Sequence, residues 1–149
     1  MICQYDTVII DLCSVTYKLI EKGGSASDVL KDFSNFAHRI NGKYRLILLS
    51  NESHQSINAM LCLNGEDKLF AKIISAEDVS HKKPGLEIFD ATLEIIQRKP
   101  SQCIFIDTQV KNLLFAEEVG ISALLFNTDG ENFDGMSVCS FNELFDIIG

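Results

Sequence analysis

Short apolar segments alternate with segments of helical spacing along nearly the whole chain. This alternation is typical of a parallel sheet whose strands are joined by crossover helices. The apolar segments are strand-sized and rich in Val, Ile and Leu, as expected of strands buried on both faces. They occupy residues 7–10, 45–49, 71–75, 103–106 and 122–126. The sequence therefore predicts one three-layer α/β domain over residues 1–149 with a mainly parallel five-stranded sheet.

Helices are expected where apolar residues recur at helical spacing between these strands. Their expected ranges are 25–40, 56–63, 84–99, 110–119 and 141–148. Residues 17–24 are predicted to form a short apolar turn with a Gly-Gly break, and residues 127–135 a polar loop.

Polar side chains stand where the predicted strands end or the next helices begin. They are Asp11, Ser50, Asn51, Lys83, Asp107 and Thr108. Because the loops that follow parallel strands meet at one edge of a sheet, we expect these side chains to converge. Open α/β sheets bind their ligands at this edge, so the sequence predicts a functional site there.

Asp11, Ser50 and Lys83 are chemically suited to one reaction. An aspartate that attacks a phosphoryl group needs a cation and hydrogen-bond donors that offset charge on the transferring oxygens. Lys83 can supply the cation, and Ser50 can supply a donor. The set favours phosphoryl transfer with Asp11 as the nucleophile.

The order of these residues resembles the motifs of the haloacid dehalogenase superfamily. Its first motif is an apolar strand that leads to Asp-x-Asp; Asp11 matches the nucleophile, and Cys13 stands where the general acid and base is expected. Ser50 and Asn51 match the second motif, a Ser or Thr often followed by Asn. Lys83, which is followed by proline, matches the third.

The fourth motif of this family is an apolar strand that ends in a pair of acids and leads to Gly-Ile. Asp107 and Thr108 hold the paired positions here, and Gly120 lies 13 positions after Asp107, as in the family. The resemblance covers nearly the whole chain and implies a Rossmann-like sheet of strand order 5-4-1-2-3. It also implies a phosphoester phosphatase that forms an aspartyl-phosphate on Asp11, with the second and third motifs holding the phosphate.

Two positions depart from the family pattern. The thiol of Cys13 is a poor general acid because its ordinary pKa is about 8.5. Thr108 replaces the acid that usually binds magnesium in the family. The resemblance implies magnesium as cofactor, and the ligands left to it are Asp11, the Cys13 carbonyl, Asp107 through water and the Thr108 hydroxyl. Since only two of these are carboxylates, weak magnesium binding is expected.

These positions also have structural interpretations. Cys13 is more simply a buried thiol without a chemical role than a reactive one. Ser50 and Asn51 are suited to capping the following helix, and Asp107 to fixing its own loop. The alternative to a weak phosphatase is therefore a catalytically inactive protein of the same fold that binds a phosphorylated ligand or a protein. A receiver-like phosphoacceptor is disfavoured, because receivers carry the acceptor aspartate on their third strand.

The spacing between motifs leaves no room for a cap domain. Ser50 lies 39 positions after Asp11, and Lys83 lies 33 positions after Ser50. Predicted helices and one strand fill both intervals. In this family an open site implies a macromolecular substrate or closure by another subunit, so a phosphorylated small molecule or macromolecule, a protein partner and a homo-oligomer all stay open. Dehalogenation, which depends on a cap, is not expected.

Charge and composition exclude other classes. The chain has 13 basic and 21 acidic residues and a net charge of −8, which argues against nucleic acid and anionic membrane as partners. No apolar run is long enough to span a membrane, and the N-terminus lacks the basic start of a secretory signal. The five cysteines have no paired spacing, so neither a disulfide framework nor a zinc site is indicated. A cytoplasmic protein is expected.

Overall fold

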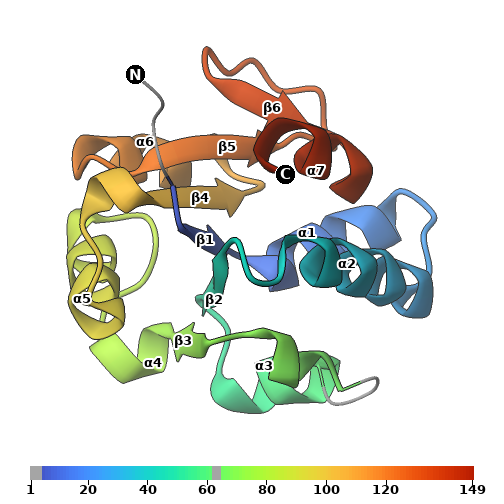
Figure 1. The fold of residues 1–149 in the computed structure, drawn as a ribbon, viewed down its shortest axis with the longest axis horizontal. Coiled ribbons are helices and arrows are strands. Elements are labelled where there is room, and N and C mark those ends of the chain that lie inside the picture. The colour runs from blue at the N-terminus through green and yellow to red at the C-terminus, as the bar shows by residue number, and fades with distance from the viewer. Residues whose placement is uncertain (1–4, 62–64) are drawn as a thin grey trace.

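The computed structural model describes residues 5–61 and 65–149 and shows a sheet between two layers of helices (Figure 1). Within these residues the sheet has six strands in the order β3-β2-β1-β4-β5-β6, and all neighbouring strands are parallel. The strands are β1 (Thr7–Ile10), β2 (Arg45–Ser50), β3 (Lys72–Ser75), β4 (Cys103–Asp107), β5 (Ser122–Phe126) and β6 (Met136–Val138). This is a Rossmann-like three-layer α/β fold.

Helices cover both faces of the sheet. One face carries α1 (Leu12–Glu21), α2 (Ala26–Ile40), α3 (His54–Leu61) and α7 (Phe141–Ile148), and the other carries α5 (Leu86–Ile96) and α6 (Val110–Glu118) (Figure 1). The short helix α4 (Ala76–Val79) and the 3₁₀ turns η1 (Glu66–Leu69) and η2 (Pro100–Gln102) complete the described elements. No helix among the described residues is long and apolar enough to cross a bilayer.

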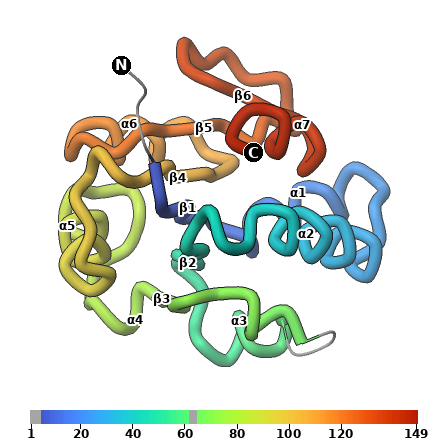
Figure 2. The backbone as a smooth tube through the Cα atoms, in the orientation of Figure 1, coloured from blue at the N-terminus to red at the C-terminus, as the bar shows by residue number. Residues whose placement is uncertain are grey.

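The chain path places a topological switch point beside β1. From β1 the chain moves to β2 and then β3, after which it returns to the other side of β1 to form β4 (Figure 2). The direction of strand addition therefore reverses between β1 and β4. Ligands of open α/β sheets bind at such a reversal, outside the carboxyl ends of the strands. Asp11 follows β1 directly, and Asp107 is the last residue of β4.

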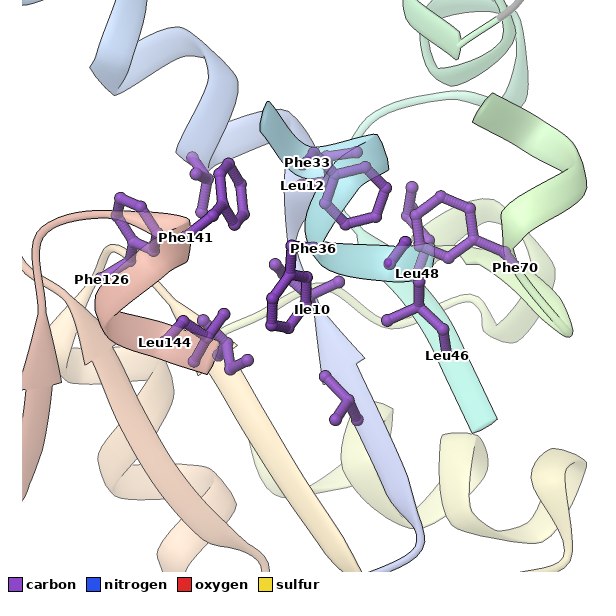
Figure 3. Close-up of a cluster of buried hydrophobic side chains, with 14 of the residues drawn as sticks. Ile10, Leu12, Phe33, Phe36, Leu46, Leu48, Phe70, Phe126, Phe141 and Leu144 are labelled. Carbon is purple, nitrogen blue, oxygen red and sulfur yellow. The ribbon is translucent and has the colours of Figure 1, made fainter. Parts of the chain in front are cut away.

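Successive side chains of β1 pack in two different hydrophobic cores, one on each face of the sheet. Val8 and Ile10 pack under α1, α2 and α7, whereas Ile9 packs on the opposite face under α5 and α6. The first of these cores is rich in phenylalanine, with the rings of Phe33 and Phe141 5.6 Å apart (Figure 3). Burying one such side chain contributes about 1.5–3 kcal/mol. Burial on both faces explains why the β1 sequence is continuously apolar.

The predicted order of the first five strands is confirmed, and the sheet carries a sixth. The sequence did not indicate β6, because this edge strand is three residues long and only Val138 in it is buried. The turn predicted over residues 17–24 is wrong: α1 begins directly after Asp11. Its buried Leu12, Val15 and Thr16 have helical spacing, but the strand-like run before them hid the start of the helix. The helix end predicted at residue 63 lies outside the described residues.

Candidate active site

Asp11 joins the end of β1 to the start of α1. It is the N-cap of α1: its Oδ1 accepts a hydrogen bond from the Ser14 amide at 3.1 Å, and its own amide donates to the Ile106 carbonyl of β4 at 3.0 Å. Its side chain is mostly buried. Free amides and the positive end of the helix dipole make a helix N-terminus suitable for a carboxylate or a phosphate. The fold thus places Asp11 where an anion is stabilised.

Lys83 lies between two carboxylates at this edge of the sheet. Its Nζ is 2.7 Å from Asp11 Oδ2 and 2.8 Å from Asp107 Oδ2, and it donates a third hydrogen bond to the Leu49 carbonyl at 3.3 Å. The Lys83 side chain is 0% exposed. An ammonium group has three donors, and all three are used here. The expected convergence of Asp11, Lys83 and Asp107 is therefore confirmed, while their catalytic roles stay predictions.

The charges in this cluster shift the pKa values of two groups. Burial acts to lower the pKa of Lys83, but the adjacent Asp11 and Asp107 outweigh it and raise this pKa above its ordinary value. Burial raises the pKa of Asp11, against the opposing charge of Lys83, and the negative charge of Asp107 adds to this rise. The raised pKa favours the cationic form of Lys83, which lies between the carboxyl groups of Asp11 and Asp107.

Asp107 accepts hydrogen bonds at every available position. Its Oδ1 accepts the amides of Thr108 and Gln109 at 2.6 and 3.0 Å. Its Oδ2 accepts Lys83 Nζ and, at 3.1 Å, the side-chain amide of Asn112. A carboxylate has about four acceptor sites, so all of them are occupied. In this arrangement Asp107 holds Lys83 and fixes its own loop, and it has no free lone pair for another ligand.

Ser50 and Asn51 approach the cluster from β2. Ser50 Oγ accepts the amide of Glu52 at 3.0 Å, and its hydroxyl is also hydrogen-bonded with the thiol of Cys13. Asn51 makes two hydrogen bonds to the backbone of Lys83: its Oδ1 accepts the Lys83 amide at 2.8 Å, and its Nδ2 donates to the Lys83 carbonyl at 2.9 Å. Asn51 thereby holds the loop that carries Lys83. The sequence does not indicate this contact, because a side chain that binds the backbone of a distant loop leaves no local pattern.

Cys13 lies in the first turn of α1 and is 2% exposed. Burial, followed by the negative charges of Asp11 and Glu52, raises the pKa of its thiol to about 12, although a hydrogen bond with Ser50 acts in the opposite direction. An efficient general acid or base has a pKa near the working pH. Cys13 is therefore a neutral thiol that is poorly suited to carry protons at neutral pH.

The oxygen atoms around Thr108 bear on metal binding. Thr108 Oγ1 and Asn112 Oδ1 are both buried and have no hydrogen-bond partner among the described residues. No group of three or more His, Cys, Asp or Glu side chains that could hold a metal occurs within residues 5–61 and 65–149. Magnesium is often bound through one or two carboxylates, several waters and a substrate phosphate. Asp11 and Thr108 fit such an ion, and a preformed protein cage does not exist in this part of the chain.

A cavity of about 340 Å³ adjoins the cluster at Thr108. Its walls come from α1, from the loop between β4 and α6, from the start of α6 and from the loop after β5, and they include Lys18, Lys111 and Asp129.

This protein is an α/β protein with an aspartate at the end of its first strand. At the switch point of the sheet this aspartate, Asp11, shares Lys83 with Asp107. The sequence pattern of the family described as haloacid dehalogenase-like hydrolase matches residues 20–126. The chain belongs to this family.

Solved structures of the same family share the fold. YfnB from Bacillus subtilis, described as a putative hydrolase of the family bound to magnesium, is 12% identical with a TM-score of 0.76 and covers 98% of this chain and 99% of its own. A phosphatase of the family from Thermococcus onnurineus is 15% identical with a TM-score of 0.73, covering 98% of both chains. An L-2-haloacid dehalogenase is also similar, with a TM-score of 0.66, 15% identity and coverage of 77% of this chain and 55% of its own. Because identity is so low, these likenesses show the fold alone.

Part of the chain also resembles a curated protein. The drimenol cyclase drtB from Aspergillus calidoustus is 29% identical over 91 residues, which are 61% of this chain and 17% of the cyclase. This chain therefore spans less than a fifth of that relative.

Proposed function

We propose that this protein is a phosphoester phosphatase that works through an aspartyl-phosphate on Asp11. The observation that carries the proposal is the buried cluster in which Lys83 contacts both Asp11 and Asp107 beneath the N-terminus of α1. A cation and helix amides placed together suit a phosphoryl group. A phosphatase in the family with the same fold supports this choice.

The proposed first step is a displacement at phosphorus. A carboxylate oxygen of Asp11 forms a bond to phosphorus while the bond to the alkoxide leaving group breaks. Lys83 and the Ser50 hydroxyl offset negative charge on the phosphoryl oxygens. Asp107 and Asn51 act indirectly, because they hold Lys83 by its ammonium group and by its backbone. In the second step water releases the phosphate and restores Asp11.

Magnesium is the proposed cofactor and is expected to bind weakly. Asp11 and Thr108 Oγ1 would hold it together with water and the substrate phosphate, whose charge the ion would partly neutralise. Structures of family members bound to magnesium support this proposal, among them BT-2542 from Bacteroides thetaiotaomicron, which contains magnesium and inorganic phosphate. BT-2542 is 18% identical, with a TM-score of 0.63, and covers 87% of this chain and 97% of its own.

An open site is part of the proposal. The segments between Asp11 and Ser50 form α1 and α2, and the described residues between Ser50 and Lys83 form α3, η1, β3 and α4. Residues of α1, α2 and α3 pack into the core, so these elements do not build a separate cap. The substrate is accordingly a phosphorylated macromolecule, or a small molecule enclosed by a partner protein or a second copy of this chain.

The test is covalent labelling of Asp11. The protein is incubated with magnesium and 4-nitrophenyl phosphate, quenched in acid and mapped by mass spectrometry. We expect one phosphoryl group on Asp11 and none on the Asp11→Asn variant. An unlabelled Asp11 under conditions that label an active relative would instead favour an inactive, ligand-binding protein of this fold.

A further inference from the structure

The proposed reaction lacks a group that can take a proton from water. Hydrolysis of an aspartyl-phosphate needs a base beside the attacking water. Cys13 holds the position where the family places this group, but it is 2% exposed and packs in the hydrophobic core. A side chain buried in this way does not contact bulk water. The base must therefore come from another element at the same edge of the sheet.

Glu52 is held at this edge by its backbone. Its amide donates to Ser50 Oγ at 3.0 Å, and its carbonyl accepts the hydroxyl of Ser75, at the end of β3, at 2.7 Å. These two bonds fix the residue between the carboxyl ends of β2 and β3. Its side chain is half-buried, so it is reached by solvent.

The carboxylate of Glu52 is directed toward α1. Glu52 Oε1 accepts a hydrogen bond from the hydroxyl of Tyr17 at 3.3 Å. Tyr17 lies on α1, the helix that Asp11 caps. The carboxylate thus bridges the loop that carries Ser50 and the helix that begins at Asp11. Among the described residues no hydrogen bond engages its second oxygen, which leaves a lone pair for water.

The charges of Glu52 and Asp11 both act on Tyr17. Burial raises the pKa of the Tyr17 phenol, and the negative charges of Glu52 and Asp11 raise it further. Both carboxylates therefore act on one side chain of α1. This agrees with the position that the hydrogen bonds assign to Glu52.

We propose that Glu52 is the base that activates water for hydrolysis of the aspartyl-phosphate on Asp11. The inference rests on the proposed function. Glu52 takes a proton from water as the water oxygen forms a bond to phosphorus and the bond between phosphorus and Asp11 breaks. Inorganic phosphate leaves, Asp11 returns as a carboxylate, and protonated Glu52 passes its proton to the alkoxide of the next substrate or to solvent. Tyr17 orients the Glu52 carboxylate as a positioning residue.

The experiment separates formation of the phosphoenzyme from its hydrolysis. With 4-nitrophenyl phosphate the leaving group needs little protonation, so the nitrophenolate burst reports formation, and loss of label after dilution reports hydrolysis. In Glu52→Gln we expect an unchanged burst and hydrolysis slower by about 10²–10⁴-fold. The matched control is Glu77→Gln, which removes a neighbouring charge whose carboxylate contacts the His54 amide instead; its hydrolysis rate should equal that of the parent.

Chemical rescue distinguishes a base from a structural residue. Glu52→Ala should hydrolyse as slowly as Glu52→Gln, and added acetate should restore its rate in proportion to concentration. Equal hydrolysis rates in the parent and Glu52→Gln, or a slow Glu52→Ala that acetate does not restore, would overturn the role of Glu52 while leaving Asp11 as the nucleophile. A parent protein that forms no phosphoenzyme at all would refute the proposed function, and this inference with it.

Discussion

This protein has a buried ionic cluster of one lysine and two aspartates, and an exposed ionic cluster of one aspartate and two lysines. In the candidate site one lysine, Lys83, contacts two aspartates at 2.7 and 2.8 Å, and its side chain is 0% exposed. Beside α1 one aspartate, Asp129, contacts Lys18 at 2.9 Å and Lys22 at 3.5 Å, and the three side chains are 32–54% exposed. The distances are similar, so geometry alone does not separate the two clusters.

Burial gives the clusters different consequences. Removing one partner from a buried set leaves charge without compensation, whereas water and salt replace a lost partner at the surface. In the buried cluster all hydrogen-bonding positions of Lys83 and Asp107 are occupied, so these two residues fix each other. The exposed cluster only fastens the loop after β5 to α1. Identical residue types therefore make a rigid site in one place and a weak surface contact in the other.

The largest effect is expected on removing the buried cation. Lys83→Met should lower the free energy of unfolding by about 3–5 kcal/mol, because it leaves two buried carboxylates unpaired. Lys18→Met is the matched control, and its urea midpoint should stay close to that of the parent. Urea unfolding followed by circular dichroism measures both. Equal losses in the two variants would contradict the comparison.

The pH dependence of this loss should follow the raised pKa of Lys83. A base whose folded-state pKa lies above its unfolded value adds stability that is present below the unfolded value, here 10.5, and disappears as pH rises through the folded one. The stability difference between the parent and Lys83→Met should thus be constant between about pH 8 and pH 10 and shrink above pH 10.5. Urea titrations at several pH values check this. A difference that already shrank as pH rose from 8 to 10 would argue against a cationic Lys83.

A smaller effect is expected where Asn51 holds the Lys83 backbone. Asn51→Ala removes two hydrogen bonds, each worth about 0.5–1.5 kcal/mol, so we expect a loss of about 1–3 kcal/mol. Asn58→Ala, on the exposed side of α3, should change stability little. Urea midpoints of both variants are compared with that of the parent. If the two matched, the loop that carries Lys83 would be held by other contacts.

The sequence was informative about the buried cluster because parallel strands have a fixed geometry. Asp11 and Asp107 follow apolar runs that pair in register, with Ile10 opposite Ile106, so their meeting could be expected. The contacts of Lys83 with the Leu49 carbonyl and with Asn51 could not, since they depend on how a loop folds back over the sheet. Glu52 was also missed, although an acid two positions after a strand end is a visible signal. The role proposed for Glu52 depends on the burial of Cys13, which only packing decides.

The edge strand β6 and helix α1 show another limit. A strand of three residues with a single buried side chain has almost no hydrophobic period, so tertiary pairing with β5 decides its conformation. Helix α1 begins directly after β1, because Asp11 alone separates the apolar run of β1 from Leu12. Periodicity detects the middle of an element far better than it detects such a start.

The central position of β1 has a consequence for how this chain folds as it is made. Residues 7–10 pair with residues 45–48 on one side and with residues 103–106 on the other. While the ribosome is still adding the middle of the chain, one edge of β1 has no partner, and an apolar strand with open amides and carbonyls can pair with other nascent chains. Closing such distant contacts is slow compared with forming helices. Asp11 can therefore meet Asp107 only after the chain has been synthesised beyond residue 107, and until then rapid formation of the helical layers would limit such pairing.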